Sequence, residues 1–174
     1  KIKWNGQFII RNKRSFNSAD FDNLANSGCT GLTLGIESGS ESVRHHMRKK
    51  FTNDDLDYFI HNLGKRNIKM KFLLIAGYPT ETKDDFRQTI EMLHKFKKYS
   101  NITEVSPHMM LIDKNTPLDY DHRELYDDYG FNWINDTSNY DIRYERFKEI
   151  FEVGHACGYG FKKHALDKIA KFAV

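Results

Sequence analysis

Four short apolar stretches, rich in β-branched and aromatic residues, recur along the chain with helical patterns between them. Such alternation is typical of α/β proteins built on a parallel sheet. The third stretch ends in five consecutive apolar residues, Phe72 to Ala76, as expected of a strand that is covered on both faces. We therefore predict a mostly parallel sheet with strands over residues 7–11, 31–36, 69–76 and 104–112.

The helices between these strands are marked by caps and by apolar periodicity. Thr52, with Asp55 three residues later, resembles an N-terminal capping box, and Thr82 suits the start of another helix. Shorter helices are predicted from about Ser18 and Ser40. The apolar positions of the two longer helices recur at helical spacing, with Leu56, Phe59, Ile60 and Leu63 in the first and Phe86, Ile90, Leu93 and Phe96 in the second.

The last third of the chain has a different pattern. Residues 119–141 are rich in Tyr and Asp and show little periodicity, so we predict an irregular connection there. We thus divide the chain into a strand–helix part, 1–118, and a part of connection and C-terminal helices, 119–174, that packs on it. The predicted inward positions of these helices are Tyr144, Phe147, Ile150 and Phe151 in one, and Leu166, Ile169 and Ala170 in another that begins at about Lys162.

The composition is that of a soluble globular domain, with 39% hydrophobic and 29% charged residues in a chain of 174. The net charge of +3 comes from interspersed acidic and basic residues and indicates no nucleic-acid-binding face. No apolar run approaches the roughly 20 residues that span a bilayer. Cys29 and Cys157 each lack a second Cys or a His at metal-ligand spacing, so we expect no metal site within the chain and a cytoplasmic protein.

Ligands of parallel sheets and barrels bind beyond the carboxyl ends of the strands. The second predicted strand is followed by Glu37, Ser38 and a Gly- and Ser-rich turn before a helix. A carboxylate there suits a hydroxyl or ammonium group, such as that of a ribose or an amino acid, and backbone amides at the helix start suit an anion. The turn can equally be a plain helix cap with Glu37 in solvent, and the spacing leaves both interpretations open.

The third predicted strand ends in Ile75 and Ala76, and Gly77 and Tyr78 follow. Gly77 would let a ligand approach the main chain closely, and such an edge can read a flat heterocycle. The alternative is a tight turn in which Glu81 supports the start of the next helix, and for Glu81 we prefer this second interpretation. Tyr78 is either a stacking platform or a loop anchor.

Three further features carry charge or can titrate. Arg11, at the end of the first predicted strand, can clamp a carboxylate or pair with an acid such as Glu37. His108 lies on the fourth, where a lone histidine is more often structural than catalytic. The basic run from Arg48 to Lys50 is interpreted as a solvated helix end.

Four ordered motifs together resemble the radical S-adenosylmethionine superfamily. The similarity is to the branch whose members often carry an N-terminal cobalamin-binding domain, such as the anaerobic cyclases of Mg-protoporphyrin monomethyl ester. It covers residues 4–118, and the order and separation of the motifs make it specific. The motifs are Gln-Phe-Ile-Ile-Arg at 7–11, Ser-Gly-Cys-Thr-Gly-Leu-Thr-Leu-Gly-Ile-Glu-Ser-Gly-Ser at 27–40, Ile-Ala-Gly-Tyr-Pro-Thr-Glu-Thr at 75–82, and Asn-Thr-Pro-Leu at 115–118, where the family usually has Gly-Thr-Pro.

By this resemblance the chain is the C-terminal part of a partial (β/α)6 TIM-like barrel, comprising its third to sixth strands, with C-terminal helices added. The end of the fourth barrel strand would contact the ribose and methionine part of S-adenosylmethionine. The main chain at the end of the fifth would read the adenine, and an arginine of the third would lie near the cofactor's carboxylate. In chain order, the implied cofactor-binding residues are Arg11, Glu37, Ser38, Ile75, Ala76, Gly77 and Tyr78.

The resemblance also implies a four-iron four-sulfur cluster whose three-cysteine motif would lie upstream of Lys1, in the missing N-terminal half of the barrel. The parent protein would then be the enzyme that cleaves S-adenosylmethionine to start radical chemistry, and some members of this branch also use cobalamin. Its substrate, a small molecule or a macromolecule, is not specified by these motifs. We expect no turnover from the chain alone.

Two further expectations concern partners. Without the preceding barrel strand, the edge at residues 7–11 would be unpaired, and unpaired edges invite self-association, so we expect the chain to dimerise there. The competing hypothesis is a self-contained small α/β domain that binds a nucleotide or a protein partner without catalysis.

Overall fold

The computed structural model describes residues 2–161, which form a four-stranded parallel sheet and its connecting helices. The strands follow one another across the sheet in chain order, so a crossover joins each strand to the next. The strands are β1 (Trp4–Phe8), β2 (Cys29–Glu37), β3 (Lys69–Ala76) and β4 (Ile102–Met109). The helices are α1 (Ser18–Asn26), α2 (Glu41–His46), α3 (Asn53–Lys65), α4 (Lys83–Phe96), α5 (Pro117–His122) and α6 (Tyr140–Ala156), with a 3-10 turn, η1 (Arg123–Leu125).

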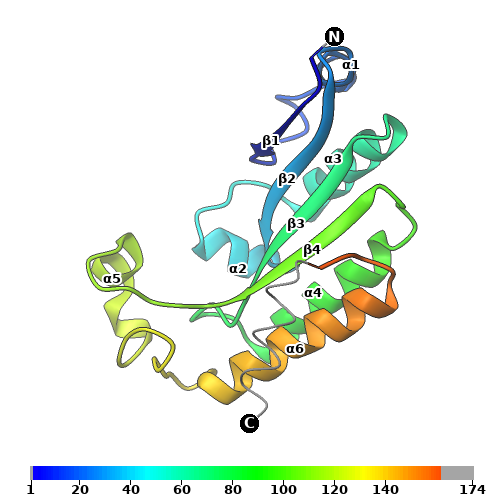
Figure 1. Cartoon of the computed structure of the whole chain (residues 1–174). Coiled ribbons are helices and arrows are strands. Elements are labelled where there is room, and N and C mark those ends of the chain that lie inside the picture. The colour runs from blue at the N-terminus through cyan, green and yellow to red at the C-terminus, as the bar shows by residue number, and fades with distance from the viewer. Residues whose placement is uncertain (1, 162–174) are drawn as a thin grey trace.

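The helices α3, α4 and α6 gather on one side of the sheet, as Figure 1 shows. The predicted α/β class and parallel sheet are thereby confirmed. No helix within residues 2–161 is long and apolar enough to cross a membrane. The helix predicted from about Lys162 lies outside the described residues.

The helix caps follow the sequence closely. Thr52 with Asp55 forms the predicted capping box of α3, and Thr82 forms one of the same kind at the start of α4. Ser40 caps α2 through the amide of Val43. The cap of α1 is Asn17, one residue before the predicted start at Ser18.

The first strand differs from its prediction, because β1 begins at Trp4 and ends at Phe8 instead of spanning residues 7–11. Pairing with β2 sets its register, with Trp4 opposite Cys29 and Phe8 opposite Leu34. The chain then leaves the sheet, so Ile9 is 65% exposed although Ile10 turns back into the core. Phe8 at the end of β1 and Ile10 beyond it both contact the core, so the apolar run extends past the strand.

The fourth strand ends at Met109, three residues before its predicted end, and the chain continues into a compact segment that we call the 110–139 lobe. Residues 119–139 are mostly irregular, as predicted, with isolated bridges in place of strands, but the lobe also contains α5 and a small core of its own. Figure 1 shows the lobe standing beyond the carboxyl ends of the strands, next to the start of α6. The buried hydrophobic residues of this core are Ile112, Tyr126 and Trp133.

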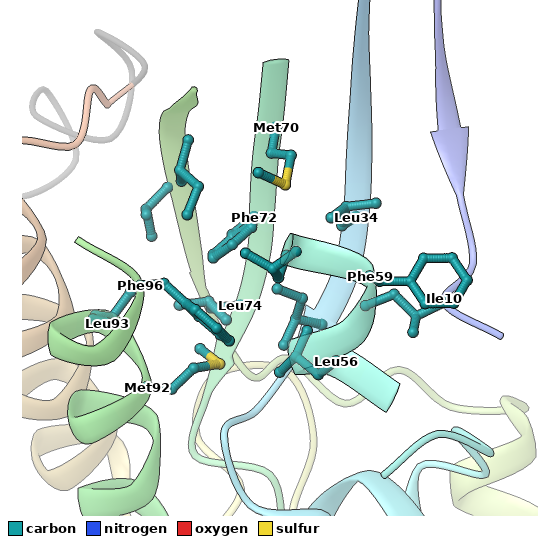
Figure 2. Close-up of a cluster of buried hydrophobic side chains, with 14 of the residues drawn as sticks. Ile10, Leu34, Leu56, Phe59, Met70, Phe72, Leu74, Met92, Leu93 and Phe96 are labelled. Carbon is teal, nitrogen blue, oxygen red and sulfur yellow. The ribbon is translucent and has the colours of Figure 1, made fainter. Parts of the chain in front are cut away.

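The main core lies between the sheet and the helices. Even-numbered residues of β3 face this core, and Figure 2 shows Phe72 and Leu74 directed toward side chains of α3 and α4. Phe59 of α3 is fully buried and its ring packs near that of Phe8, which fixes β1 to the helical layer. The opposite face of the sheet carries the half-exposed odd-numbered residues of β3, among them Leu73 and Ile75. This open face leads to the carboxyl ends of the strands.

Candidate functional site

The carboxyl end of β2 is a strained turn centred on Glu37. Its φ is 69°, and the Ser38 amide donates to the Ile36 carbonyl at 2.9 Å. A three-residue turn of this kind with positive φ is rare for a residue other than glycine, and such conformations cost on the order of 1–3 kcal/mol. Strained turns of this sort concentrate at functional sites, and here the strain directs a carboxylate to the open face.

Lys49 is the partner of this carboxylate. Its Nζ lies 2.9 Å from Glu37 Oε1 and 3.4 Å from the Gly35 carbonyl oxygen. The pair is sheltered, since the Lys49 side chain is 26% exposed and that of Glu37 16%. Gly35 makes room for it, because a Cβ there would lie 2.6 Å from Glu37 Oε1. Neither a solvated Glu37 nor a solvated Lys49 fits this arrangement.

Ser38 is directed away from the open face and into the contact between α2 and α4. It is fully buried, and its hydroxyl lies 3.3 Å from that of Thr89 and accepts from the Ser40 amide at 3.1 Å. Its carbonyl accepts from the guanidinium of Arg44 at 2.7 Å. Burial lowers the pKa of Arg44 to about 10, which leaves it charged at neutral pH. Ser38 thus holds the Glu37 turn in place.

The end of β3 is closed by contacts from within the chain. The Ala76 carbonyl accepts from the Met110 amide at 2.9 Å, and the Gly77 amide donates to Glu81 Oε2 at 2.9 Å. Gly77 has a φ of +83°, and a Cβ there would lie 2.6 Å from the Cδ of Arg143. The space that glycine leaves is therefore filled by Arg143. Ile75, in contrast, stands half-exposed on the open face.

The preferred interpretation of a tight turn after β3 is confirmed, because the Glu81 amide donates to the Tyr78 carbonyl at 2.8 Å, but Thr82 and Asp85, not Glu81, cap the next helix. Glu81 is fully buried and forms an ion pair with Arg146 of α6 at 2.9 Å. Burial raises the pKa of Glu81 to about 7, although Arg146 and the Gly77 amide act in the opposite direction. Tyr78 is also buried, and its hydroxyl donates to the His46 carbonyl at 3.4 Å, as a loop anchor does.

The other predicted candidates stand apart from this group. Arg11 is exposed and lies three residues beyond β1, and within residues 2–161 no hydrogen bond or ion pair joins it to Glu37, whose partner is Lys49. His108 is exposed on β4, with its Nε2 3.3 Å from the Ser106 hydroxyl. The structure thus brings Glu37 and Ser38 together at one strand end and Ile75 to Tyr78 at the neighbouring one.

The described residues do not provide a metal or cluster site. In this part of the chain, no three His, Cys, Asp or Glu side chains gather in a group that could hold a metal ion. The donor set at the end of β2 fits a different ligand, because Glu37 and Lys49 present one anion and one cation side by side. An amino acid moiety, with its ammonium and carboxylate, complements such a pair.

Comparison with known proteins decides the family, since residues 8–93 match the model of the radical SAM superfamily. The chain belongs to the radical SAM superfamily. The matched region runs from the end of β1 into α4 and includes both strand ends described above. Members of this superfamily use S-adenosylmethionine and a four-iron four-sulfur cluster. The cluster does not fit the residues described here, whereas the Glu37 and Lys49 pair fits the amino acid part of S-adenosylmethionine.

Two of the similar proteins carry the names of tRNA-modifying enzymes. The chain is 26% identical over 149 residues, 84% of its length, to a tRNA-2-methylthio-N(6)-dimethylallyladenosine synthase of Clostridium tetani. It is 31% identical over 68 residues, 38% of its length, to a threonylcarbamoyladenosine tRNA methylthiotransferase of Drosophila melanogaster. The chain spans 29% and 12% of the lengths of these two relatives.

A solved radical SAM structure shares the fold. Coproporphyrinogen III oxidase (HemN) from Escherichia coli superposes on 87% of the chain with a TM-score of 0.61 at 14% sequence identity. The chain covers 32% of that protein. The likeness therefore supports the predicted part of a radical SAM barrel as the fold of this chain.

Three residues of the site region were not found from the sequence. Lys49 was interpreted as solvated. The sequence contains one indication of its role, because one short helix and a turn separate it from Glu37 and can bring the two side chains together. Arg143 and Arg146 were hidden in a helical pattern in which charges usually face solvent. Their burial against the β3 end became visible only in the structure.

Proposed function

We propose that this chain is the S-adenosylmethionine-binding part of a radical SAM enzyme, with Glu37 and Lys49 holding the methionine moiety. The single observation that carries the proposal is the sheltered Glu37–Lys49 pair on the open face, 2.9 Å apart and set on a strained turn. On ligand binding the pair would open, Glu37 taking the ammonium and Lys49 the carboxylate. The hydrogen bond between Glu37 and Lys49 would be lost, and each side chain would gain a charge-assisted hydrogen bond to the ligand.

The adenosine part would lie toward the neighbouring strand end. Ile75 offers an apolar side chain there, at the same edge of the sheet as Glu37. The Ala76 carbonyl and the Gly77 amide already have partners within the chain, which limits what they can offer to an adenine. We therefore propose contact with Ile75 and with main-chain atoms beyond Gly77 as the basis of adenine binding.

Cleavage of S-adenosylmethionine is proposed for the whole protein only. The described residues contain no group that could hold the cluster, so the chain alone is expected to bind the cofactor and not to turn it over. The substrate of the whole protein is left open, because the named relatives are covered over less than a third of their length.

Isothermal titration of the chain with S-adenosylmethionine and with 5′-methylthioadenosine, which lacks the amino acid group, tests the proposal. Glu37→Gln and Lys49→Met should each weaken S-adenosylmethionine binding by about tenfold or more, because a charge-assisted hydrogen bond is lost. The same substitutions should leave 5′-methylthioadenosine binding nearly unchanged.

Two matched variants serve as controls. Lys50→Met removes the same charge at the exposed neighbouring position, and His108→Ala changes a titratable group on β4 beside Ile75. Both should bind S-adenosylmethionine as the wild type does. If all four variants behave alike, the chain is better described by the competing hypothesis of a small α/β domain with another ligand.

A further inference from the structure

Helix α6 and the 110–139 lobe meet at the turn that follows β3. Arg143 of α6 is fully buried, and its side chain fills the space beside Gly77. Its guanidinium lies 3.8 Å from the centre of the Trp133 ring and donates to the Phe131 carbonyl at 2.6 Å. One side chain therefore contacts both the lobe and the cofactor edge of the sheet.

Arg146 lies one turn further along α6 and contacts the same turn after β3 at Glu81. Its Nη1 donates to the Glu81 carboxylate at 2.9 Å and to the Glu81 carbonyl at 3.2 Å. The same carboxylate oxygen accepts from the Gly77 amide. The position of Gly77 is thus defined by a chain of contacts from Arg146 through Glu81, and by direct contact with Arg143.

The free-energy cost of burying these charged groups indicates that they do more than fill space. Burial lowers the pKa of Arg143 to about 10, and within the described residues its Nε and the Oε1 of Glu81 have no hydrogen-bond partner. Burying charged groups with incomplete hydrogen bonding costs free energy that a hydrophobic side chain would avoid. A guanidinium nevertheless provides what Leu or Met cannot, because Arg143 donates to the Phe131 carbonyl and to the Ser138 hydroxyl while it stacks on Trp133.

We propose that Arg143 and Arg146, acting with Glu81, are positioning residues that hold the turn after β3 and the 110–139 lobe as one unit at the cofactor edge. The proposal rests on the proposed binding of S-adenosylmethionine at this edge. The two arginines do not contact the cofactor. They fix the position of the backbone of residues 77–81. A movement of the lobe would reach that backbone through the contact of Trp133 with Arg143. Helix α6 thereby has a role in the site in addition to covering the sheet.

Other charged groups near Glu81 are consistent with this assignment. Asp85 of α4 is the nearest like charge and raises the pKa of Glu81, whereas Arg146 lowers it. Asp85 itself is held by the hydroxyls of Ser40 and Thr82. Arg146 is therefore the cation that compensates the buried carboxylate directly.

The first test needs no ligand. In 15N-labelled protein, Arg143→Met should shift the amide signal of Gly77 and the indole signal of Trp133 together, while Gly6 and Gly31 on the distant strands stay unchanged. Arg146→Met should accelerate hydrogen exchange of the Gly77 amide by about tenfold, the expected loss when a charge-assisted hydrogen bond weakens. Arg87→Met, at an exposed site of α4, is the control and should change neither signal.

Rescue separates positioning from general destabilisation. Arg146→Lys keeps a cation near Glu81 and should restore most of the protection of the Gly77 amide, whereas Arg146→Met should not. Under conditions where every variant is folded by circular dichroism, Arg143→Met should also bind S-adenosylmethionine several-fold more weakly than Arg143→Lys. Unchanged Gly77 and Trp133 signals in Arg143→Met, or equal protection in Arg146→Lys and Arg146→Met, would overturn the proposal.

The two tests fail in different ways. If the chain does not bind S-adenosylmethionine at all, the proposed function is wrong, but the coupling of Trp133 to Gly77 can still be observed in the free protein. If the cofactor binds and the amide signals do not respond, the positioning role is wrong and the proposed function stands.

Discussion

Gly39 packs directly against Thr89, so that a Cβ at Gly39 would lie 2.6 Å from the Cα of Thr89 and would overlap the neighbouring backbone of α4. The Gly39 amide also donates to the Thr89 hydroxyl at 2.9 Å. This contact places the start of α2, and with it the Glu37 turn, at a fixed distance from α4. The glycine of this turn is therefore needed for packing.

Gly39→Ala should destabilise the protein by about 2–3 kcal/mol, because the backbone of α4 cannot move aside as a flexible side chain could. Gly130→Ala is the comparison, since a Cβ there meets nothing within 4 Å and only its positive φ of 67° is unfavourable. That variant should lose about 1 kcal/mol. Urea unfolding of both variants measures the difference, and equal losses would contradict the close contact.

The strain at Glu37 predicts an unusual order of stability. Glu37→Ala and Glu37→Gly both remove the carboxylate, but only glycine adopts a φ of 69° without a Cβ penalty. The glycine variant should therefore be the more stable of the two by about 1 kcal/mol. At Thr33, in the regular part of β2, the order should be reversed, with Thr33→Ala more stable than Thr33→Gly. Thermal unfolding of the four variants decides this.

The buried carboxyl of Glu81 predicts a pH dependence. Its pKa rises from 4.5 to about 7 on folding, so the folded state binds the proton more tightly. The stabilisation from that proton is complete below pH 4.5 and is lost as the pH rises to about 7, up to about 3 kcal/mol. Relative to Glu81→Gln, the wild type should therefore lose stability between these pH values. Parallel pH profiles of the two proteins would refute this.

The open edge of β1 predicts self-association of the chain. The strand carries no charge or proline that would block pairing with another strand, and Ile9 beside it is exposed. Sedimentation at tens of micromolar should show a concentration-dependent dimer. Gln7→Lys should weaken it by placing a charge on the edge, whereas the same substitution in α4, Gln88→Lys, should not. A monomer at all concentrations would contradict the expectation.

Local signals predicted much of the fold. The capping box of Thr52 and Asp55 and the periodicity of Leu56 to Leu63 are properties of neighbouring residues, and α3 follows them. The bounds of β3 agree with the prediction because this central strand pairs on both sides along its length. Where only one neighbour exists, as for β1, pairing shifted the strand away from its apolar run.

The 110–139 lobe could not be predicted because its core depends on distant contacts. Ile112 pairs with Gly130, and the Trp133 indole donates to the Met110 carbonyl. The same reason applies to the site. A carboxylate at a strand end pointed to Glu37, but its partner Lys49 and the arginines behind Gly77 are defined by tertiary packing alone.

The stack of Arg143 on Trp133 gives the protein an optical reporter of its own. The chain has two tryptophans, and Trp4 on β1 is half-buried while Trp133 is fully buried beneath a cation. In a Trp4→Phe variant all indole fluorescence would come from Trp133. Its emission would then follow, in real time and without any label, how the lobe responds when a ligand reaches the strand ends.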